Sequence, residues 1–166
     1  QVALGTTIAN ATAAKNLVLI GDQMQLSQPM RAKHIGYAKL SSLDFILENN
    51  DTIPPDKGIF LNNTRRLNKK ICNYISSSFY DSRLTSDPIT KTRSVNLKLD
   101  PIKDEGLFYV PIDHTGCSQR SDEEADLIEK TYNKIINKEF KVDKNSGKIS
   151  PKDIMVVAPY NAQANN

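Results

Sequence analysis

The chain has 166 residues, of which 22 are Lys or Arg and 19 are Asp or Glu, so its formal net charge is +3. This length allows one domain with a sizeable core or parts of two, and so small a charge permits nucleic-acid binding through a local patch without arguing for it. Cys72 and Cys117 match no metal-ligand spacing, and with only two histidines no zinc site is proposed. No run approaches 18 apolar residues, and the N-terminus lacks the pattern of a signal peptide. We therefore expect a cytoplasmic protein with reduced thiols, no metal site and no membrane contact.

The first 58 residues contain a helical, a strand-like and a second helical segment in turn. Residues 1–15 are rich in Ala and Thr and favour a helix. Residues 17–20, Leu-Val-Leu-Ile, have the length and β-branched content of a buried strand in a parallel sheet. A further apolar stripe at helical spacing predicts a second helix: Leu40, Leu43, Ile46 and Leu47. Residues 51–58 hold two prolines and a glycine, which is the composition of a linker, so a domain boundary is expected there.

The next segments repeat this order of strand, polar loop and helix. Ile59–Leu61 is a candidate strand, and a helix with apolar residues in steps of four follows it: Leu67, Ile71, Ile75 and Phe79. Residues 85–105 are polar and irregular, and residues 106–112, GLFYVPI, are strand-like.

The last third of the chain begins with Ser121 and Glu124, which have the spacing of a capping box. The helix that this box predicts has a continuous apolar face: Ile128, Tyr132, Ile135 and Ile136. Residues 137–147 are expected to form a solvated loop, and residues 154–158 a buried strand. Strands that alternate with helices predict an α/β fold with a parallel sheet.

Polar residues follow three of the predicted strands, at 21–25, 64–66 and 159–163. Loops at the carboxyl edge of a parallel sheet lie close together, so the three could line one cleft. The amide of Gln25 offers a donor and an acceptor, which suits a phosphate oxygen and a water together, although an amide satisfied by backbone is an equal alternative. Arg65 and Arg66 suit a phosphate site because a guanidinium stays charged and binds two oxygens at once. Basic residues are disfavoured at a helix N-terminus, which favours a ligand here over a merely solvated helix start.

These three stretches resemble motifs of the superfamily 1 helicases. GDQMQLSQP at 21–29 resembles their third motif, G-D-x-x-Q-L-x-P, with one extra residue before the proline that lengthens the loop beyond Gln25. TRRLNKKICNYISSSFYDSRL at 64–84 is similar to their fourth motif region, and VVAPYNAQ at 156–163 is similar to the TPYxxQ segment of the second RecA-like domain. The resemblance runs over essentially the whole chain. It is strongest to the superfamily 1B branch of the nonsense-mediated-decay RNA helicase and the Okazaki-fragment nuclease-helicase, and to bacterial members joined to a RecB-like nuclease domain.

The resemblance implies an incomplete RecA-like motor core of the P-loop NTPase type, with ATP and Mg²⁺ as cofactors and single-stranded DNA or RNA as partner. Gln25 would contact the γ-phosphate or its attacking water, and Arg66 would act as an arginine finger. Arg65 stands where relatives often stack an aromatic ring on adenine, and an Arg plane can stack as well.

The remaining motif residues are assigned to coupling and to nucleic-acid contact. Gly21 and Asp22 would shape a loop that couples the nucleotide to the nucleic-acid groove. Pro159, Tyr160 and Gln163 would lie near the nucleic-acid strand.

Two motifs that ATP hydrolysis needs are absent from the sequence. There is no G-x-x-x-x-G-K-[ST] phosphate loop and no D-E pair after a strand. Because the D-E-A-x motif of the family precedes a stretch like the one after Gln1, we expect an internal fragment. Residues 1–52 would end the first RecA-like domain and residues 53–166 would begin the second. The Mg²⁺ ligands would then lie outside this chain, which by itself should not hydrolyse ATP.

Two other classes of function stay open as alternatives. Glu139-Phe140-Lys141 has the E-x-K spacing of the RecB-like nuclease core, but it lies in a charged stretch without an upstream partner aspartate, so a solvated turn explains it better. A non-catalytic nucleic-acid-binding module is the other alternative. Gln25 and Arg66 argue against it, because an inactive ATPase needs neither.

Overall fold

The computed structural model describes residues 2–26, 32–95, 97, 102, 105–142 and 144–165. Pro29 of the GDQMQLSQP motif lies outside the described residues. The chain divides into two compact units, Gln1–Asn62 with Asn73–Leu84, and Asn63–Cys72 with Thr85–Asn166. The units do not follow the predicted boundary at residues 52 and 53, because helix α3 (Lys69–Phe79) contributes to both. That boundary concerns the two RecA-like domains of the family, and it stays a prediction.

The first unit is mainly helical. It contains α1 (Leu4–Ala11), a 3-10 turn η1 (Gly36–Lys39), α2 (Ser42–Leu47) and the second part of α3. Backbone bonds join α1 to the start of α2: Leu4 N donates to Leu40 O over 3.2 Å and Ser42 N to Val2 O over 2.9 Å. Helix α2 begins at Ser41, which forms a complete capping box with Asp44. Leu47, at its end, is 3% exposed and belongs to the small core.

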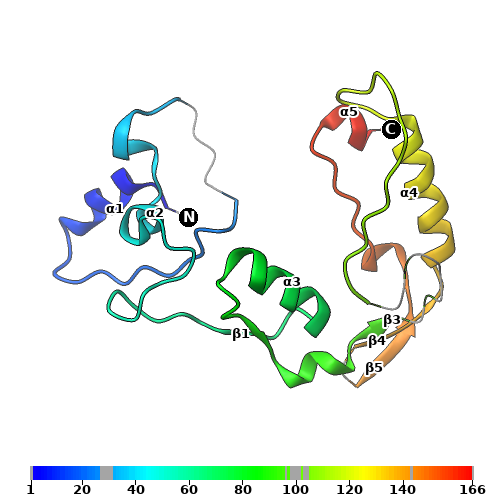
Figure 1. Ribbon diagram of the computed structural model, residues 1–166, viewed down its shortest axis with the longest axis horizontal. Coiled ribbons are helices and arrows are strands. Elements are labelled where there is room, and N and C mark those ends of the chain that lie inside the picture. The colour runs from blue at the N-terminus through cyan, green and yellow to red at the C-terminus, as the bar shows by residue number, and fades with distance from the viewer. Residues whose placement is uncertain are drawn as a thin grey trace. The chain divides into compact units, whose positions relative to one another are not determined.

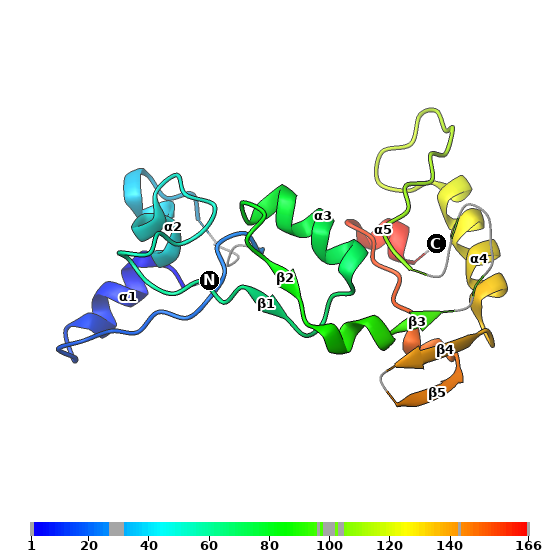
Figure 2. The ribbon, with the colours of Figure 1, turned by 60° about the horizontal axis from the view of Figure 1, so that its bottom comes forward.

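The second unit carries the strands (Figure 1). Its two-stranded parallel sheet pairs β1 (Asn63–Thr64) with β2 (Thr85–Ser86), and Figure 2 shows these two strands side by side. Its antiparallel sheet has the order β3-β4-β5, built from Ser94–Val95, Glu139–Val142 and Asn145–Lys148. The remaining elements are η2 (Pro88–Thr92), α4 (Asp122–Ile135), η3 (Pro151–Asp153) and α5 (Asn161–Ala164).

The predicted helices are confirmed, with shorter bounds. Residues 1–15 contain α1, the stripe from Leu40 to Leu47 forms α2 from residue 42 on, and the stripe from Leu67 to Phe79 forms α3 from residue 69 on. Ser121 caps α4 as predicted, because its side chain accepts from Glu124 N over 3.2 Å. Helices are predictable from local spacing because every backbone hydrogen bond in them joins near neighbours in the sequence.

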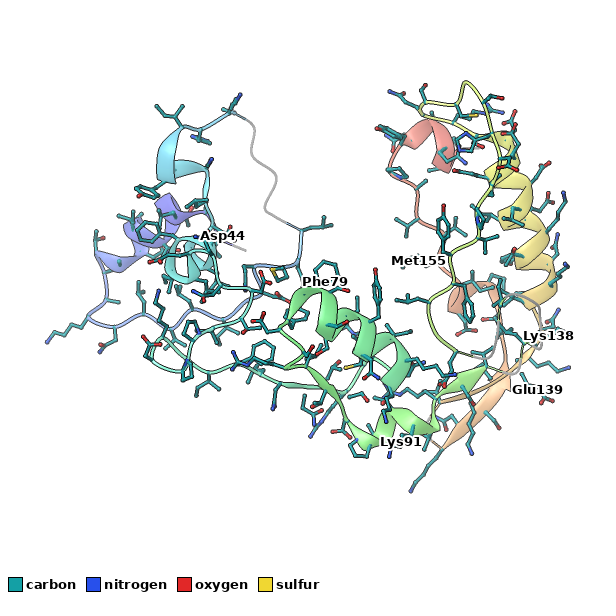
Figure 3. The ribbon with its side chains drawn as sticks, in the orientation of Figure 1. Asp44, Phe79, Lys91, Lys138, Glu139 and Met155 are labelled. Atoms are coloured by element: carbon teal, nitrogen blue, oxygen red, sulfur yellow. The ribbon has the colours of Figure 1, made fainter. Side chains whose placement is uncertain are left out.

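Four predicted strands are wrong as paired strands. Residues 17–20, 59–61, 106–112 and 154–158 have no strand assignment, although all of them are described. Most of their apolar side chains are exposed, as Met155 is in Figure 3. The physical reason is that a strand of a parallel sheet needs a neighbouring strand for its N–H and C=O groups, and among the described residues no ladder reaches these segments.

The loop expected at residues 137–147 is also wrong, because a β-hairpin forms there. Val142 pairs with Asn145 and Glu139 with Lys148, so only two residues connect β4 to β5. A two-residue connection is the commonest geometry for a hairpin. The polar composition of the stretch hid the pairing, because a hairpin on the surface does not need apolar residues at every inward position.

Candidate functional site

The first predicted loop, which we call the Asp22 loop (residues 21–26), is organised around one carboxylate. Asp22 Oδ1 accepts a hydrogen bond from Met24 N over 3.0 Å, as in an Asx turn. Asp22 Oδ2 accepts two more, from Gln25 Nε2 over 2.8 Å and from the Tyr80 hydroxyl over 2.6 Å. The side chain of Gln25 is therefore tied to Asp22, and Asp22 is tied to the end of α3.

Gly21 allows this loop to pass close to α2. A Cβ at residue 21 would lie 3.0 Å from Leu43 Cδ1, which is closer than ordinary packing allows. The neighbouring Gln23 donates from Nε2 to the backbone oxygen of Asp51. The part of the Asp22 loop that precedes Gln25 is thus packed against α2 and hydrogen-bonded to Asp51.

Tyr80 was missed as a site residue by the sequence analysis, and it is the partner that Asp22 receives from elsewhere in the fold. Burial, the hydrogen bond to Asp22 and the negative charge of Asp22 together raise the pKa of Tyr80 to about 12. The hydroxyl therefore remains a donor throughout the neutral pH range. No local sequence pattern could predict this contact, because Asp22 and Tyr80 are 58 residues apart.

The turn after α3 holds Tyr80 in place. Asp81 and Ser82 have positive φ angles of 51° and 59°, and Ser82 N donates back to Ser76 O over 2.9 Å, which closes the end of the helix. The Tyr80 ring lies 6.0 Å from the ring of Phe60, and the Arg83 guanidinium stacks 4.7 Å from the same Phe60 ring.

Thr52 forms hydrogen bonds with two side chains of this turn. Its hydroxyl donates to Asp81 Oδ2 over 2.7 Å and accepts from Arg83 Nη1 over 2.7 Å. Arg83 Nη1 also donates to Ile53 O over 3.0 Å. These side chains fix both ends of the turn, so the position of Tyr80 is set by its surroundings and not by Asp22 alone.

The second predicted loop, the arginine loop (residues 64–68), joins β1 to α3. Thr64 Oγ1 accepts from Arg66 N over 3.3 Å and from Leu67 N over 3.4 Å. Arg93 Nη1 donates to Arg65 O over 2.6 Å and to Arg66 O over 3.2 Å. The loop backbone is therefore held through its N–H groups by Thr64 and through its carbonyls by Arg93.

Asn68 begins α3 at the end of this loop. Its Oδ1 accepts from Ile71 N over 3.0 Å, as the side chain of an N-cap residue does. The Arg65 side chain is 85% exposed, and its Nε lies 3.4 Å from Asp87 Oδ2, a surface ion pair that contributes little to stability. Arg66 is exposed, and within the described part of the chain its guanidinium has no hydrogen bond or ion pair. A charged group without a partner on a fixed backbone is available for a ligand.

The third predicted loop, residues 159–163, ends in α5. Tyr160 is exposed, and Pro159 precedes it. Gln163 uses both ends of its amide on the backbone of one residue: Ser121 N donates to Gln163 Oε1 over 2.6 Å, and Gln163 Nε2 donates to Ser121 O over 3.0 Å. In a complete capping box the Ser121 N–H would bond to Glu124, so Gln163 takes the place of that second bond.

An open groove of about 790 Å³ lies along α4 beside Gln163. Its apolar lining includes Ile128, Tyr132 and Val156. Three carboxylate residues also line it, Asp122, Asp126 and Glu129. Negative charge of this kind repels nucleic-acid phosphates, so nucleic-acid contact through Tyr160 would have to lie away from the groove.

The predicted site residues therefore fall into three groups. Gly21, Asp22 and Gln25 lie together in the first unit, while the arginine loop and residues 159–163 belong to the second. No hydrogen bond or ion pair in the described ranges joins Arg65 or Arg66 to residues 159–163. That the three loops line one cleft stays a prediction.

Metal and nuclease chemistry find no support in the described residues. No three His, Cys, Asp or Glu side chains lie close enough there to hold a metal ion. Glu139, which is labelled in Figure 3, and Lys141 are exposed on β4. Glu139 pairs with Lys148 across the hairpin. None of the described helices is both long and apolar enough to cross a membrane.

A family model described as "AAA domain" matches residues 39–166, about three quarters of the chain. The chain belongs to the AAA domain family. This agrees with the predicted fold class, an α/β core of the RecA-like P-loop NTPase type, which is confirmed. The parallel pairing of β1 with β2 is consistent with that class.

Two curated proteins are similar to this AAA domain chain over most of its length. Both are named "DNA polymerase alpha-associated DNA helicase A". The protein from Schizosaccharomyces pombe is 29% identical and matches 89% of the chain, and the one from Saccharomyces cerevisiae is 27% identical and matches 96%. The chain spans about a quarter of the length of these relatives, 23% and 25%. No solved structure matches it. These matches support the resemblance to superfamily 1 helicases, and they do not distinguish between branches of that superfamily.

Proposed function

We propose that the chain is part of an ATP-driven helicase of superfamily 1, in which Gln25 responds to the terminal phosphate of the nucleotide and Arg66 acts as an arginine finger. The observation that carries the proposal is the arginine loop. An exposed guanidinium without a described partner projects from a backbone that Thr64 and Arg93 hold in place. A cation that is oriented before the reaction costs no reorganisation when negative charge develops on the transferring phosphoryl group.

The residues present fit the phosphate end of a nucleotide, although they do not fit the metal. ATP with Mg²⁺ would supply the phosphoryl group and the charge that balances it. Arg66 can donate two parallel hydrogen bonds to phosphate oxygens, and Arg65 can stack its planar group on a base. No carboxylate cluster among the described residues suits Mg²⁺. That the metal is held elsewhere in the protein stays a prediction.

Gln25 would orient the attacking water or read the γ-phosphate. Its amide nitrogen is bound by Asp22, so the amide plane is fixed relative to the Asp22 loop. Gly21 and Asp22 shape that loop and would transmit its position to the groove that binds the nucleic acid. In phosphoryl transfer such a glutamine acts by positioning, because the protein performs little covalent chemistry itself.

The finer assignments of branch and partner also belong to this proposal. Both relatives are named as DNA helicases, which favours single-stranded DNA over RNA as the partner. Tyr160 is exposed and could stack on a base, whereas the amide of Gln163 is engaged with Ser121. The superfamily 1B branch, the cytoplasmic location and a fused RecB-like nuclease domain stay predictions.

The test is steady-state ATP hydrolysis by the full-length protein, with and without single-stranded oligonucleotides of DNA or RNA. Arg66→Ala should lower kcat by about 10³-fold or more, the range measured for arginine fingers, with a small effect on KM. Arg93→Ala should lower kcat in the same direction, by about tenfold, because the loop loses one side chain that orients it. Lys152→Ala, an exposed residue of η3, is the matched control.

The outcomes separate the alternatives. Strand-stimulated hydrolysis that Arg66→Ala leaves unchanged would refute the arginine finger. A full-length protein that binds single strands but does not hydrolyse ATP would favour a non-catalytic nucleic-acid-binding module. Stimulation by DNA but not by RNA would identify the partner.

A further inference from the structure

We propose that Tyr80 is a positioning residue for Gln25, acting through the carboxylate of Asp22 that both side chains share. The structural part of this inference concerns how Gln25 is held. Its functional part rests on the proposed role of Gln25 in reading the terminal phosphate of the nucleotide.

One oxygen carries both contacts. Asp22 Oδ2 accepts from the Tyr80 hydroxyl over 2.6 Å and from Gln25 Nε2 over 2.8 Å, while Oδ1 accepts from Met24 N over 3.0 Å. The Met24 bond limits rotation of the carboxylate, and the Tyr80 bond fixes the side of the loop on which Oδ2 lies. Gln25 can reach Oδ2 in this geometry only through the donor end of its amide, so the network also fixes which way the amide faces.

Tyr80 itself is anchored independently of Asp22. Its ring packs near Phe60, and the turn that follows it is closed by the bond from Ser82 N to Ser76 O. Burial and Asp22 raise the pKa of its hydroxyl from 10 to about 12, so the hydroxyl stays a donor well above neutral pH. Because Tyr80 is held by contacts other than Asp22, it can fix the position of Asp22, and Asp22 in turn can fix the amide of Gln25.

Asp22 and Tyr80 are 58 residues apart in the sequence, yet both belong to the first compact unit, Gln1–Asn62 with Asn73–Leu84. The bond between them is therefore an internal contact of that unit, and it links the Asp22 loop to the end of α3.

The first measurement is the side-chain amide of Gln25, followed by NMR in the ¹⁵N-labelled chain and assigned by its loss in Gln25→Ala. Tyr80→Phe removes the hydroxyl and keeps the ring beside Phe60. We expect hydrogen exchange of the Gln25 amide to become about tenfold faster, the factor that corresponds to one modest hydrogen bond. Tyr74→Phe is the control, because Tyr74 lies on the same helix and its side chain is exposed. Exchange that is unchanged in Tyr80→Phe would overturn the inference.

The second measurement is a double-mutant cycle on ATP hydrolysis by the full-length protein. Tyr80→Phe should lower kcat without raising KM, and it should add nothing in a Gln25→Ala background. Independent effects of the two substitutions would overturn the inference. Should Tyr80→Phe fail to fold, Asp22→Asn, which weakens the same bonds and removes no ring, is measured in both assays with the same two criteria.

The two proposals can fail separately. A protein that does not hydrolyse ATP refutes the proposed function, and the exchange rate of the Gln25 amide, which needs no nucleotide, still decides whether Tyr80 positions it. Hydrolysis that requires Gln25 but ignores Tyr80 preserves the proposed function and refutes the inference.

Discussion

Replacing Gln163 by alanine tests whether this side chain holds the start of α4. The substitution removes two hydrogen bonds with the backbone of Ser121, one of 2.6 Å to its N–H and one of 3.0 Å to its C=O. Ser121 is 4% exposed, so water cannot freely replace both partners. Each bond contributes about 1 kcal/mol net, and a buried group left without a partner adds about 1 kcal/mol or more. We expect the free energy of unfolding to fall by about 3 kcal/mol.

Urea unfolding followed by circular dichroism measures this loss. Asn165→Ala, at the exposed end of α5, is the control and should change the free energy of unfolding by less than about 0.5 kcal/mol. Gln163→Glu keeps an acceptor for Ser121 N–H but loses the donor to Ser121 O, so its loss should be intermediate. A Gln163→Ala variant as stable as the control would refute the reasoning. Weaker binding to single strands at unchanged stability would instead support the nucleic-acid role predicted for Gln163.

Two further predictions concern titration and thiol chemistry. The pKa of Tyr80 rises on folding from 10 to about 12, so its contribution to the free energy of unfolding is complete below pH 10 and is lost as the pH rises through 12. The free energy of unfolding should be measured between pH 8 and 12 for the unsubstituted chain and for Tyr80→Phe. The difference between the two free energies should shrink at the alkaline end. Cys72 is fully buried and its pKa is raised by burial, whereas Cys117 is partly exposed. A thiol reagent should therefore label Cys117 in the folded chain and Cys72 only after unfolding, and mass spectrometry of the labelled peptides checks this.

The helices were predictable because the interactions that specify them are local. Ile71, Ile75 and Phe79 of the predicted apolar stripe lie on α3, and Ser121 caps α4 through a residue three positions away. Of the capping box predicted at Ser121 and Glu124, the bond from Glu124 N to the Ser121 hydroxyl is present for the same reason. The reciprocal bond was predicted wrongly: Ser121 N donates to Gln163, 42 residues further along the chain, and not to Glu124.

In the candidate site, too, the contacts between residues near in sequence were predictable and the contacts between distant residues were not. Turn chemistry within the Asp22 loop and the Thr64 bonds of the arginine loop involve residues up to three positions apart, and motif resemblance pointed to both loops. Neither Tyr80 nor Arg93 could be placed beside these loops, because each reaches its partner from a distant part of the chain. Their side chains are ordinary helix and loop residues in sequence, and only the fold makes them neighbours.

The predicted strands do not form a sheet, and the exposure of their apolar side chains indicates what a stable sheet would require. Residues 17–20, 59–61 and 154–158 have no strand assignment, and each contains two apolar side chains, two positions apart, that are 77–87% exposed: Val18 and Ile20, Ile59 and Leu61, Met155 and Val157. Alternation is the period of a strand, and apolar residues on both faces are typical of parallel strands covered by helices on each side. Full burial of one such side chain contributes about 1.5–3 kcal/mol, so the six together represent about 9–18 kcal/mol. That is as large as the stability of a whole domain. Covering these outward faces is therefore a condition for a stable parallel sheet, and the composition of the segments already matches that condition.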